Sequence, residues 1–418
     1  YYDCDPTSHK LKDNPGKSLK EIGEKEAKSF NMDFDEFVGP EEIRKLVDVN
    51  AEEYRCFFIL KYKNKSAIVR TFMDMIYWPT EDEIAAALNR LVETPPKIGF
   101  VTSEIERGPF SEKLRDYKGL ACDITFRHSL MNQGFDFDTL SLDKPIQPGY
   151  AALVLADPRV PFQQEALERI GKYIDEGGNL MVMTEPDRRE VVKPVLDKLG
   201  ITQRNGLLIQ PSTRYSSDLV FNYMTTVAKN LSPQYARKFS RWTRCFGDTS
   251  FKVALPGASA LEWRSNGFVV EPLLVTNEKL SWNRTAAIDN DSLQLSIKKL
   301  PGDEMGTFVT ALKMHRMVNG KEQRVIVAGD ADYLTRPGSH QALVEGRGDR
   351  YNDTYAFWCL SYFSYGKFPA NTLKNEPLDN KFHAGLGAVT LQKAILIWII
   401  PGVMAIGCMI ILIRRKRK

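Results

Sequence analysis

The stretch YAALVLADPRVPFQQEALERIGKYIDEGGNLMVMTEP, residues 150–186, decides the fold. It reads as an apolar strand, a helix and a second apolar strand. In the middle part, Phe162, Ala166, Ile170 and Ile174 recur at four-residue steps, which predicts a helix with one apolar face, and the glycine pair at 177–178 closes it. The two strands are apolar throughout. This pattern is typical of a parallel sheet that helices cover on both faces.

Similar segments lie on both sides of this unit. Before it, KIGFV (97–101) reads as a strand and PFSEKLRDYKGL (109–120) as a helix. After it, REVVKPVLDKLG (189–200) reads as a helix, and RVIVAGDAD (324–332) as an apolar strand that returns to the same sheet. A strand-rich insertion lies near 205–320. We therefore expect one α/β domain over residues 94–345.

Residues 1–93 predict a smaller α+β domain. The stretch 17–30 reads as a charged surface helix, and the apolar runs at 55–62 and 66–73 as two strands. A capping box, Thr80 with Glu83 three residues on, predicts the start of another helix. The sequence Thr94-Pro95-Pro96 marks the boundary to the next domain.

The C-terminus predicts a membrane anchor. Residues 394–413, AILIWIIPGVMAIGCMIILI, carry no charge and are long enough to cross a bilayer as a helix, which we place at 391–413. The basic tail 414–418 follows and predicts a cytoplasmic end, so the bulk of the chain should be extracytoplasmic, in the periplasm beside the inner membrane. Because the chain starts at Tyr1 without Met, we expect a removed or further segment before it.

An aromatic-rich segment, 346–390, precedes the anchor. Seven aromatic residues crowd between positions 351 and 365. One interpretation is a helix that packs on the sheet. The other is a partner surface close to the membrane.

Composition excludes several function classes. The 418 residues carry a net charge of +4, with 26% charged and 43% hydrophobic residues, an ordinary globular mixture without an electrostatic case for nucleic acid. Six scattered cysteines predict neither a disulfide framework nor a zinc site. The chain contains neither the P-loop pattern G-x-x-x-x-G-K-[ST] nor the dinucleotide-binding pattern G-x-G-x-x-G. We therefore expect no cofactor and no nucleotide hydrolysis by this chain.

Candidate binding residues follow the predicted strands of the sheet. Because parallel strands place ligands beyond their carboxyl ends, charged residues just after these strands should meet at one rim. The alternative is that these charged residues only cap the strand ends and form ion pairs with one another. The candidates are Glu104, Glu106, Arg107, Asp157, Arg159, Glu185, Asp187, Arg188, Asp330 and Asp332.

Catalytic signatures are weak in this chain. No G-x-S-x-G pattern occurs, no serine or cysteine follows the strand NLMVM, and the five histidines lie far apart. No catalytic residue and no metal ligand is assigned. Paired carboxylates for glycoside chemistry stay open, since their separation cannot be read from sequence.

Several local patterns resemble one family, the auxiliary component of gliding-motility-type ABC transporters (GldG-like). The most specific pieces are 170–182, IGKYIDEGGNLMV, and 324–334, RVIVAGDADYL. The Asp5-Pro6 turn, the helix at 81–91, the strand PKIGFV and a single C-terminal span also fit. The loop at 103–108, SEIERG, departs from the family's G-H-G-E, and Gly149-Tyr150 replaces the family's acid.

The resemblance implies a flavodoxin-like sheet of the class I glutamine-amidotransferase type without its catalytic cysteine. It implies a non-enzymatic extracytoplasmic subunit beside an ABC permease and an ATPase, which binds and couples rather than breaking bonds. Two alternatives stay open: a membrane-tethered hydrolase acting on glycans or amides, and an adhesion or scaffold ectodomain.

Overall fold

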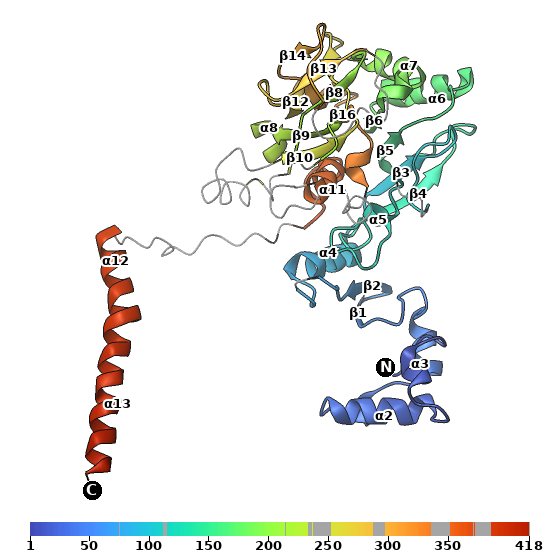
Figure 1. Ribbon diagram of the computed structural model, residues 1–418. Coiled ribbons are helices and arrows are strands. Elements are labelled where there is room, and N and C mark those ends of the chain that lie inside the picture. The colour runs from blue at the N-terminus through green and yellow to red at the C-terminus, as the bar shows by residue number, and fades with distance from the viewer. Residues whose placement is uncertain are drawn as a thin grey trace. The chain divides into compact units, whose positions relative to one another are not determined.

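The structure is a computed structural model that describes residues 1–74, 76–111, 115–213, 215–232, 236, 252–286, 297–335, 352–370, 372 and 386–417. The chain divides into two compact units, Tyr1–Thr372 and Leu373–Lys418. Figure 1 shows the elements of each unit, and the two are described separately below.

A nine-stranded sheet forms the centre of the first unit, in the order β10-β9-β12-β15-β16-β6-β5-β3-β4. The pairs from β16 to β4 are parallel, and the remaining pairs are antiparallel. The strands are β3 (Lys97–Val101), β4 (Asp136–Leu140), β5 (Tyr150–Ala156), β6 (Leu180–Met183), β9 (Leu219–Met224), β10 (Lys252–Pro256), β12 (Val269–Val275), β15 (Val309–Val318) and β16 (Lys321–Ala328).

This topology confirms part of the prediction and corrects part of it. β16 returns to the sheet beside β6, as expected from its apolar run. The sheet is mixed rather than parallel throughout, because strands of the strand-rich insertion pair into the same sheet from the β15 side. Shorter strands form two small sheets: β7 (Ile201–Gln203) with β11 (Leu261–Trp263), and β8 (Leu207–Ile209) with β13 (Trp282–Arg284) and β14 (Glu304–Met305).

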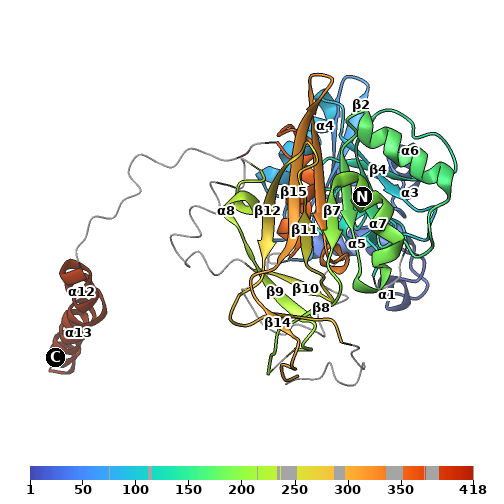
Figure 2. The ribbon, with the colours of Figure 1, turned by 90° about the horizontal axis from the view of Figure 1, so that it is seen from above.

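Helices cover both faces of the sheet. Alternate residues of β5 point to opposite sides: Leu153 and Leu155 belong to one core cluster, Ala152 and Val154 to the other. The first cluster includes residues of α6 (Gln164–Asp175) and α7 (Arg189–Leu199), which lie on the same side of the sheet (Figure 2). The second includes residues of α5 (Lys118–Ala121), α8 (Thr226–Lys229) and α11 (Asn352–Tyr362). Burial on both faces explains why these strands are apolar throughout.

Most of the described aromatic residues of the segment before the anchor are part of this core, whereas Tyr365 is 37% exposed. Tyr355, Phe357, Trp358 and Phe363 are all buried, on or just after α11. Phe357 meets Phe135 edge-on, with 5.8 Å between ring centroids. The packing interpretation is therefore favoured over an exposed partner surface for these residues, while Tyr351 lies outside the described residues.

The helix expected at 109–120 is shorter than predicted. Of its described residues, only Lys118–Leu120 are helical, in α5, while residues 112–114 lie outside the described part. The backbone before α5 forms a non-helical hydrogen bond: the N–H of Tyr117 donates to the carbonyl of Gly108 (3.0 Å). A backbone N–H that donates to the loop after β3 cannot also form a helical hydrogen bond.

The N-terminal segment has the predicted helices and strands, and the irregular stretch Tyr1–Asp5 leads into the turn at Asp5-Pro6. Glu83 accepts from the N–H and hydroxyl of Thr80 (2.7 and 2.8 Å), as the capping pattern predicts. That residues 1–93 fold as a separate domain stays a prediction. The elements are α1 (His9–Lys12), α2 (Leu19–Ser29), η1 (Phe34–Glu36), α3 (Pro40–Leu46), β1 (Phe57–Tyr62), β2 (Lys65–Arg70) and α4 (Glu81–Val92).

The second unit contains the predicted apolar helix. It runs from α12 (Leu386–Ala394) through a π-helical turn (η7, Ile395–Ile399) into α13 (Ile400–Lys416). Within the described residues, Gly387–Lys416 is the one helix long and apolar enough to cross a membrane, with a mean hydropathy of 2.7 over its most apolar window.

One glycine at the end of β16 is required by close packing, and this gives a first prediction. The N–H of Gly329 donates to Thr310, its carbonyl accepts from Ser259, and a Cβ there would collide with the Ser259 carbonyl oxygen. We expect Gly329→Ala to lower the free energy of unfolding by about 1–3 kcal/mol, measured by denaturant unfolding of the full chain in detergent.

Gly171→Ala is the matched control for Gly329→Ala. Gly171 lies inside α6 and a Cβ there would meet nothing within 4 Å, so alanine should be neutral or stabilise by up to about 1 kcal/mol. Equal stability of the two variants would contradict the packing described at the strand end.

Candidate functional site

Arg107 lies at the centre of the strand-end rim. Its side chain is 1% exposed, although arginine is almost never fully buried unless it is paired. The loop after β3 carries it there: the N–H of Arg107 donates to the carbonyl of Ala156 at the end of β5 (3.0 Å). This loop therefore extends the pairing of β3 with β5 beyond the sheet and directs the guanidinium across the rim.

Three carboxylates from three other strand ends surround this guanidinium. Nε donates to Asp157 (3.1 Å), Nη2 to Glu185 (2.7 Å) and Nη1 to Asp332. Nη1 also donates to the carbonyl of Arg115 (3.2 Å). Four of the five donor hydrogens of the guanidinium thus have an acceptor. We call Arg107, Asp157, Glu185 and Asp332 the buried ion cluster.

The backbone around the ion cluster is bent to bring these groups together. Asp157 has a left-handed backbone with φ 52°, and its N–H donates to the carbonyl of Met183 at the end of β6 (3.0 Å). Glu185 also accepts from the N–H of Ala331 (3.2 Å) through the oxygen that Arg107 binds. The ends of β3, β5, β6 and β16 are therefore joined through one guanidinium and its partners.

Negative charge exceeds positive charge in this region. Asp330 is fully buried beside the cluster, and its Oδ2 has no hydrogen-bond partner among the described residues. Burial, with the neighbouring Glu185 and Asp332 carboxylates, raises the pKa of Asp330 well above its ordinary value. Burial and the Asp332 carboxylate raise the pKa of Glu185 to about 8, against the opposing effect of Arg107. The excess charge is thus relieved by bound protons.

Arginine keeps its charge in this setting. Burial opposes ionisation of Arg107, but Tyr117 and the carboxylates of Asp332, Glu185 and Asp157 outweigh it and raise the pKa of the guanidinium above its usual range. A second cation, Arg115, lies 3.5 Å from Asp332 with an exposed side chain. The cluster is therefore a fixed, charged centre with one exposed cation, Arg115, beside it.

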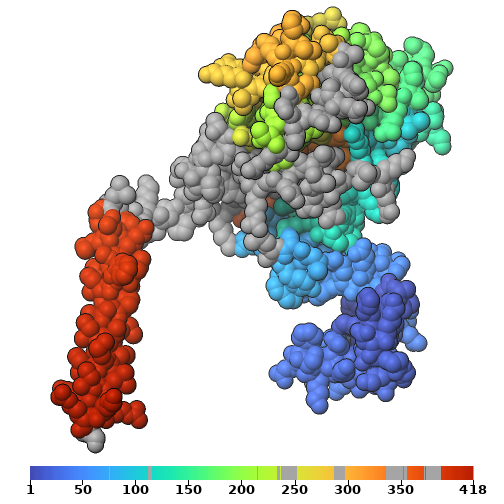
Figure 3. Space-filling model, in the orientation of Figure 1, coloured from blue at the N-terminus to red at the C-terminus, as the bar shows by residue number. Residues whose placement is uncertain are grey.

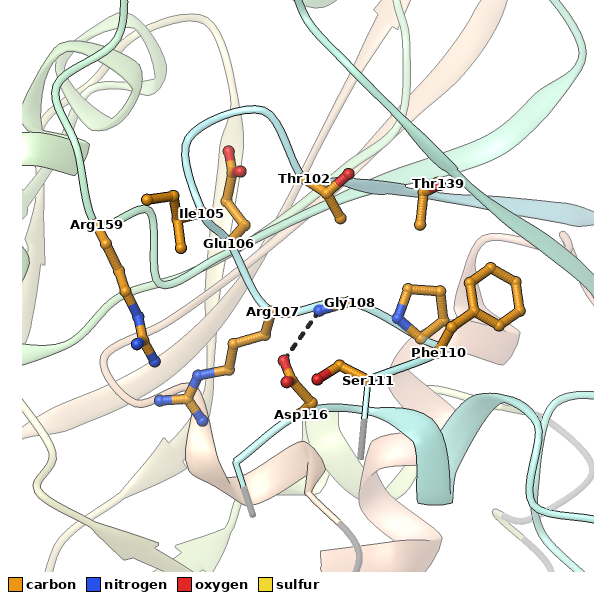
Figure 4. A pocket seen from close by; sticks show the side chains of 11 residues that line it. Thr102, Ile105, Glu106, Arg107, Gly108, Phe110, Ser111, Asp116, Thr139 and Arg159 are labelled. Atoms are coloured by element: carbon orange, nitrogen blue, oxygen red, sulfur yellow. Dashed lines mark hydrogen bonds between the residues drawn. The ribbon is translucent and has the colours of Figure 1, made fainter. Parts of the chain in front are cut away.

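A pocket of about 230 Å³ lies beside the ion cluster. Figure 4 shows its lining, which comes from the loop after β3, the end of β4 and the loop after β5. In the sheet, β3 lies between β5 and β4, so the strand order reverses at β3. The pocket lies at this point of reversal. The lining residues are Thr102, Ile105, Glu106, Arg107, Gly108, Pro109, Phe110, Ser111, Asp116, Thr139 and Arg159.

Two glutamates of this loop are buried as well. Glu106 accepts from the N–H of Glu104 through Oε2 (2.7 Å), and its Oε1 has no partner among the described residues. Burial raises the pKa of Glu106 to about 8, and the Glu104 carboxylate adds to this effect. Glu104 accepts from the hydroxyl of Ser103. Glu106 is thus held as a neutral acid near neutral pH.

The ten sequence-predicted residues separate into three groups. Arg107, Asp157, Glu185 and Asp332 form the ion cluster, and Asp330 lies against it. Glu104, Glu106 and Arg159 belong to the two loops beside it, with Arg159 3.6 Å from Asp157. Asp187 and Arg188 instead lie outside, paired with each other at 3.4 Å on the short helix η2 (Pro186–Arg188).

Three residues that the sequence did not suggest complete the rim. Arg115 contacts Asp332, and Asp116 accepts from the N–H of Gly108 (3.2 Å). The hydroxyl of the buried Tyr117 donates to the carbonyl of Ala331 (2.8 Å), just before η5 (Asp332–Leu334). All three lie in the stretch that reads as a helix in sequence, well past the end of β3, so the strand-end rule could not find them.

Comparison with known proteins gives one family match. The family described as "ABC-type uncharacterized transport system", an auxiliary component, matches residues 95–357. Among curated proteins, none matches the chain.

Solved structures share the overall arrangement only weakly. The chain is similar to the "mmIFT52 N-terminal domain" at 14% identity and TM-score 0.43, covering 65% of this chain and 98% of that one. An exo-β-1,4-mannosidase from Opitutaceae bacterium strain TAV5 is 10% identical, with TM-score 0.32 over 70% and 38% of the two chains. A β-galactosidase from Rahnella sp. R3 is 10% identical, with TM-score 0.33 over 66% and 32%.

The ion cluster leads to a prediction about stability. Arg107→Met leaves the buried acids Asp157, Glu185 and Asp332 without their cation, so we expect the free energy of unfolding to fall by about 3–5 kcal/mol. Arg159→Met removes a partly exposed cation from the same rim and should cost about 1 kcal/mol or less. Denaturant unfolding of the two variants compares them directly, and a similar loss in both would contradict a central role of Arg107.

The raised pKa of Glu185 predicts a pH dependence. The folded state keeps a proton up to about pH 8, whereas the unfolded chain releases it near the ordinary glutamate value of 4.5. Because the native state binds more protons in this window, stability is greatest below it and falls as the pH rises towards 8. Glu185→Gln should flatten this slope, measured as midpoints of denaturant unfolding from pH 5 to 8.

The exposed Glu190→Gln serves as the control for this variant. Its side chain is 72% exposed at the start of α7, so the wild-type slope should persist. A wild-type slope in Glu185→Gln as well would show that Glu185 does not carry the proton.

Proposed function

Since the chain belongs to the family of auxiliary components of ABC-type transport systems, we propose that it is a membrane-anchored, extracytoplasmic subunit that binds and couples to a permease and an ATPase rather than catalysing a reaction. The observation that carries this proposal is the buried ion cluster. Its charged side chains are bound to one another at the edge where an α/β enzyme would present reactive groups.

Two further features support this proposal. The described lining of the neighbouring pocket contains neither histidine nor cysteine. The helix Gly387–Lys416 has the length and apolar composition of a membrane anchor, and the basic residues at its end favour a cytoplasmic tail. An inner-membrane protein with a periplasmic bulk, of the gliding-motility type, fits these features.

The strand order favours a specific fold kinship. Numbered along the chain, the five parallel strands run 2-1-3-4-5, from β4 through β3, β5 and β6 to β16. This is the order of flavodoxin-like sheets, which bind ligands where the order reverses. We propose that the pocket beside Arg107 holds a small ligand or a partner loop, contacted by Glu106, Arg159 and the residues near them.

One observation favours a second function, a membrane-tethered hydrolase acting on glycans or amides. Glu106 has a raised pKa and shares the pocket lining with Asp116, and glycosidases use a carboxylic acid with a raised pKa together with a second carboxyl group. Figure 4 shows the two side chains on opposite sides of the loop backbone, an arrangement that does not bring them to one substrate bond. Hydrolysis abolished by Glu106→Gln would establish this function instead.

Purification of the intact complex tests the proposal. The tagged full chain, solubilised from its native membranes in mild detergent, should recover a permease and an ATPase in constant ratio. An unrelated protein with a single membrane span, expressed at the same level, is the control. Recovery of the chain without either subunit, under conditions in which it is folded, would contradict the proposed role.

A further inference from the structure

Large apolar side chains are exposed on the N-terminal segment. The loop between β2 and α4 presents Met73, Ile76, Tyr77 and Trp78, which are 76%, 57%, 44% and 57% exposed. We call these four residues the apolar loop. Exposed apolar groups that gather in one place mark an interaction site rather than ordinary surface.

The apolar loop is held in place by a buried arginine. Arg127, whose side chain is 9% exposed, donates to the carbonyls of Ile76 and Trp78 and to both carboxylate oxygens of Asp74 (2.9 and 3.0 Å). Its guanidinium also lies 4.3 Å from the ring centroid of Phe72. The loop backbone is thus anchored inward while its side chains face solvent, so the loop cannot collapse to hide them.

Arg127 is itself fixed by the helix that follows the loop. It donates to Glu83 of α4 (2.6 Å), and Glu83 is buried. Asp74, Glu83 and the ring of Phe72 all contact this guanidinium. These contacts fix the conformation of the loop. Rigid presentation lowers the entropy cost of binding a partner.

The neighbouring hairpin adds aromatic and cationic groups. The ring of Phe58 lies 6.2 Å from that of Trp78. At the turn between β1 and β2, Tyr62 is exposed together with three lysines, Lys61, Lys63 and Lys65. Indole and phenol rings favour the boundary between lipid chains and headgroups, and lysines are attracted to anionic headgroups. The lysines lie beside Tyr62, at the opposite end of the hairpin from the apolar loop.

Two hydrogen bonds join α4 to the C-terminal end of the first unit. Asn89 of α4 donates to the carbonyl of Lys367 (3.0 Å), and Thr372 donates to Asp82 of the same helix. Part of the hairpin and α4 surface is uncovered in Figure 3, in light blue.

We propose that the apolar loop inserts into the headgroup region of the bilayer that the C-terminal helix crosses, giving the chain a second membrane contact. This inference rests on the proposed membrane anchoring. The lysines of the β1–β2 turn would lie over anionic headgroups while Trp78 and its neighbours enter the interface. An apolar surface of a partner protein is the competing occupant, and the experiment separates the two.

The test uses the full chain with Trp398→Phe, which removes the tryptophan of the apolar helix. The protein is reconstituted into phosphatidylcholine and phosphatidylglycerol vesicles whose acyl chains are brominated near the headgroup. We expect bromolipid to quench part of the tryptophan emission, and Trp78→Phe to abolish that part. Trp263→Phe is the control, because Trp263 is 42% exposed on β11, outside the N-terminal segment, and its removal should leave the quenching intact.

Each outcome bears on a separate claim. If Trp78→Phe leaves the quenching unchanged, the apolar loop does not contact lipid. If this protein also resists extraction by alkaline wash, the membrane anchor is still supported. Protein released by the wash would overturn the anchor, and this inference with it. Shielding of Trp78 from bromolipid when the permease is present would assign the loop to the protein partner. Lys63→Gln with Lys65→Gln should lower quenching in anionic vesicles more than in phosphatidylcholine alone.

Discussion

The structure depends on one buried cation shared by several anions. Removing a guanidinium from water costs several kcal/mol, and only excellent geometry offsets that cost. Arg107 meets this condition because four of its donor hydrogens have acceptors, from the ends of three other strands and from Arg115. The constraint is mutual: the loops after β3, β5, β6 and β16 cannot move independently without exposing an unpaired buried charge. The rim of the sheet is rigid for this reason.

The same constraint shapes what the rim can do. The charged groups of the ion cluster bind one another, and the pocket beside them lies over these fixed walls. Neutral acids at Glu106 and Glu185 keep the local charge low near neutral pH, because burial favours their protonated forms. A second buried arginine, Arg127, has a similar role: it binds backbone carbonyls of the apolar loop in the N-terminal segment. Both arginines serve presentation of a surface, which suits a binding and coupling subunit.

The sequence predicted the parts of the fold that local pattern determines. The fully apolar strands predicted burial on both faces, and the convergence of strand ends predicted that Arg107, Asp157, Glu185 and Asp332 would meet. The rule gives the position of a residue but not the direction of its side chain, so it also selected Asp187 and Arg188, which lie outside the ion cluster. The extension of the sheet by β9, β10 and β12 depends on pairing between distant segments, which no local pattern encodes. Residues 115–117 were missed because their helical composition is overridden by hydrogen bonds to the β3 loop.

In the proposed function, the chain is a non-catalytic membrane subunit whose rim is fixed by Arg107. A cryo-electron microscopy map of the chain purified from its own membranes tests this most directly. The account predicts the helix 387–416 inside the detergent belt against a permease, with the guanidinium of Arg107 still bound to its three carboxylates. A map that shows the apolar helix packed into a water-soluble assembly, or a substrate bound between displaced members of the ion cluster, would contradict it.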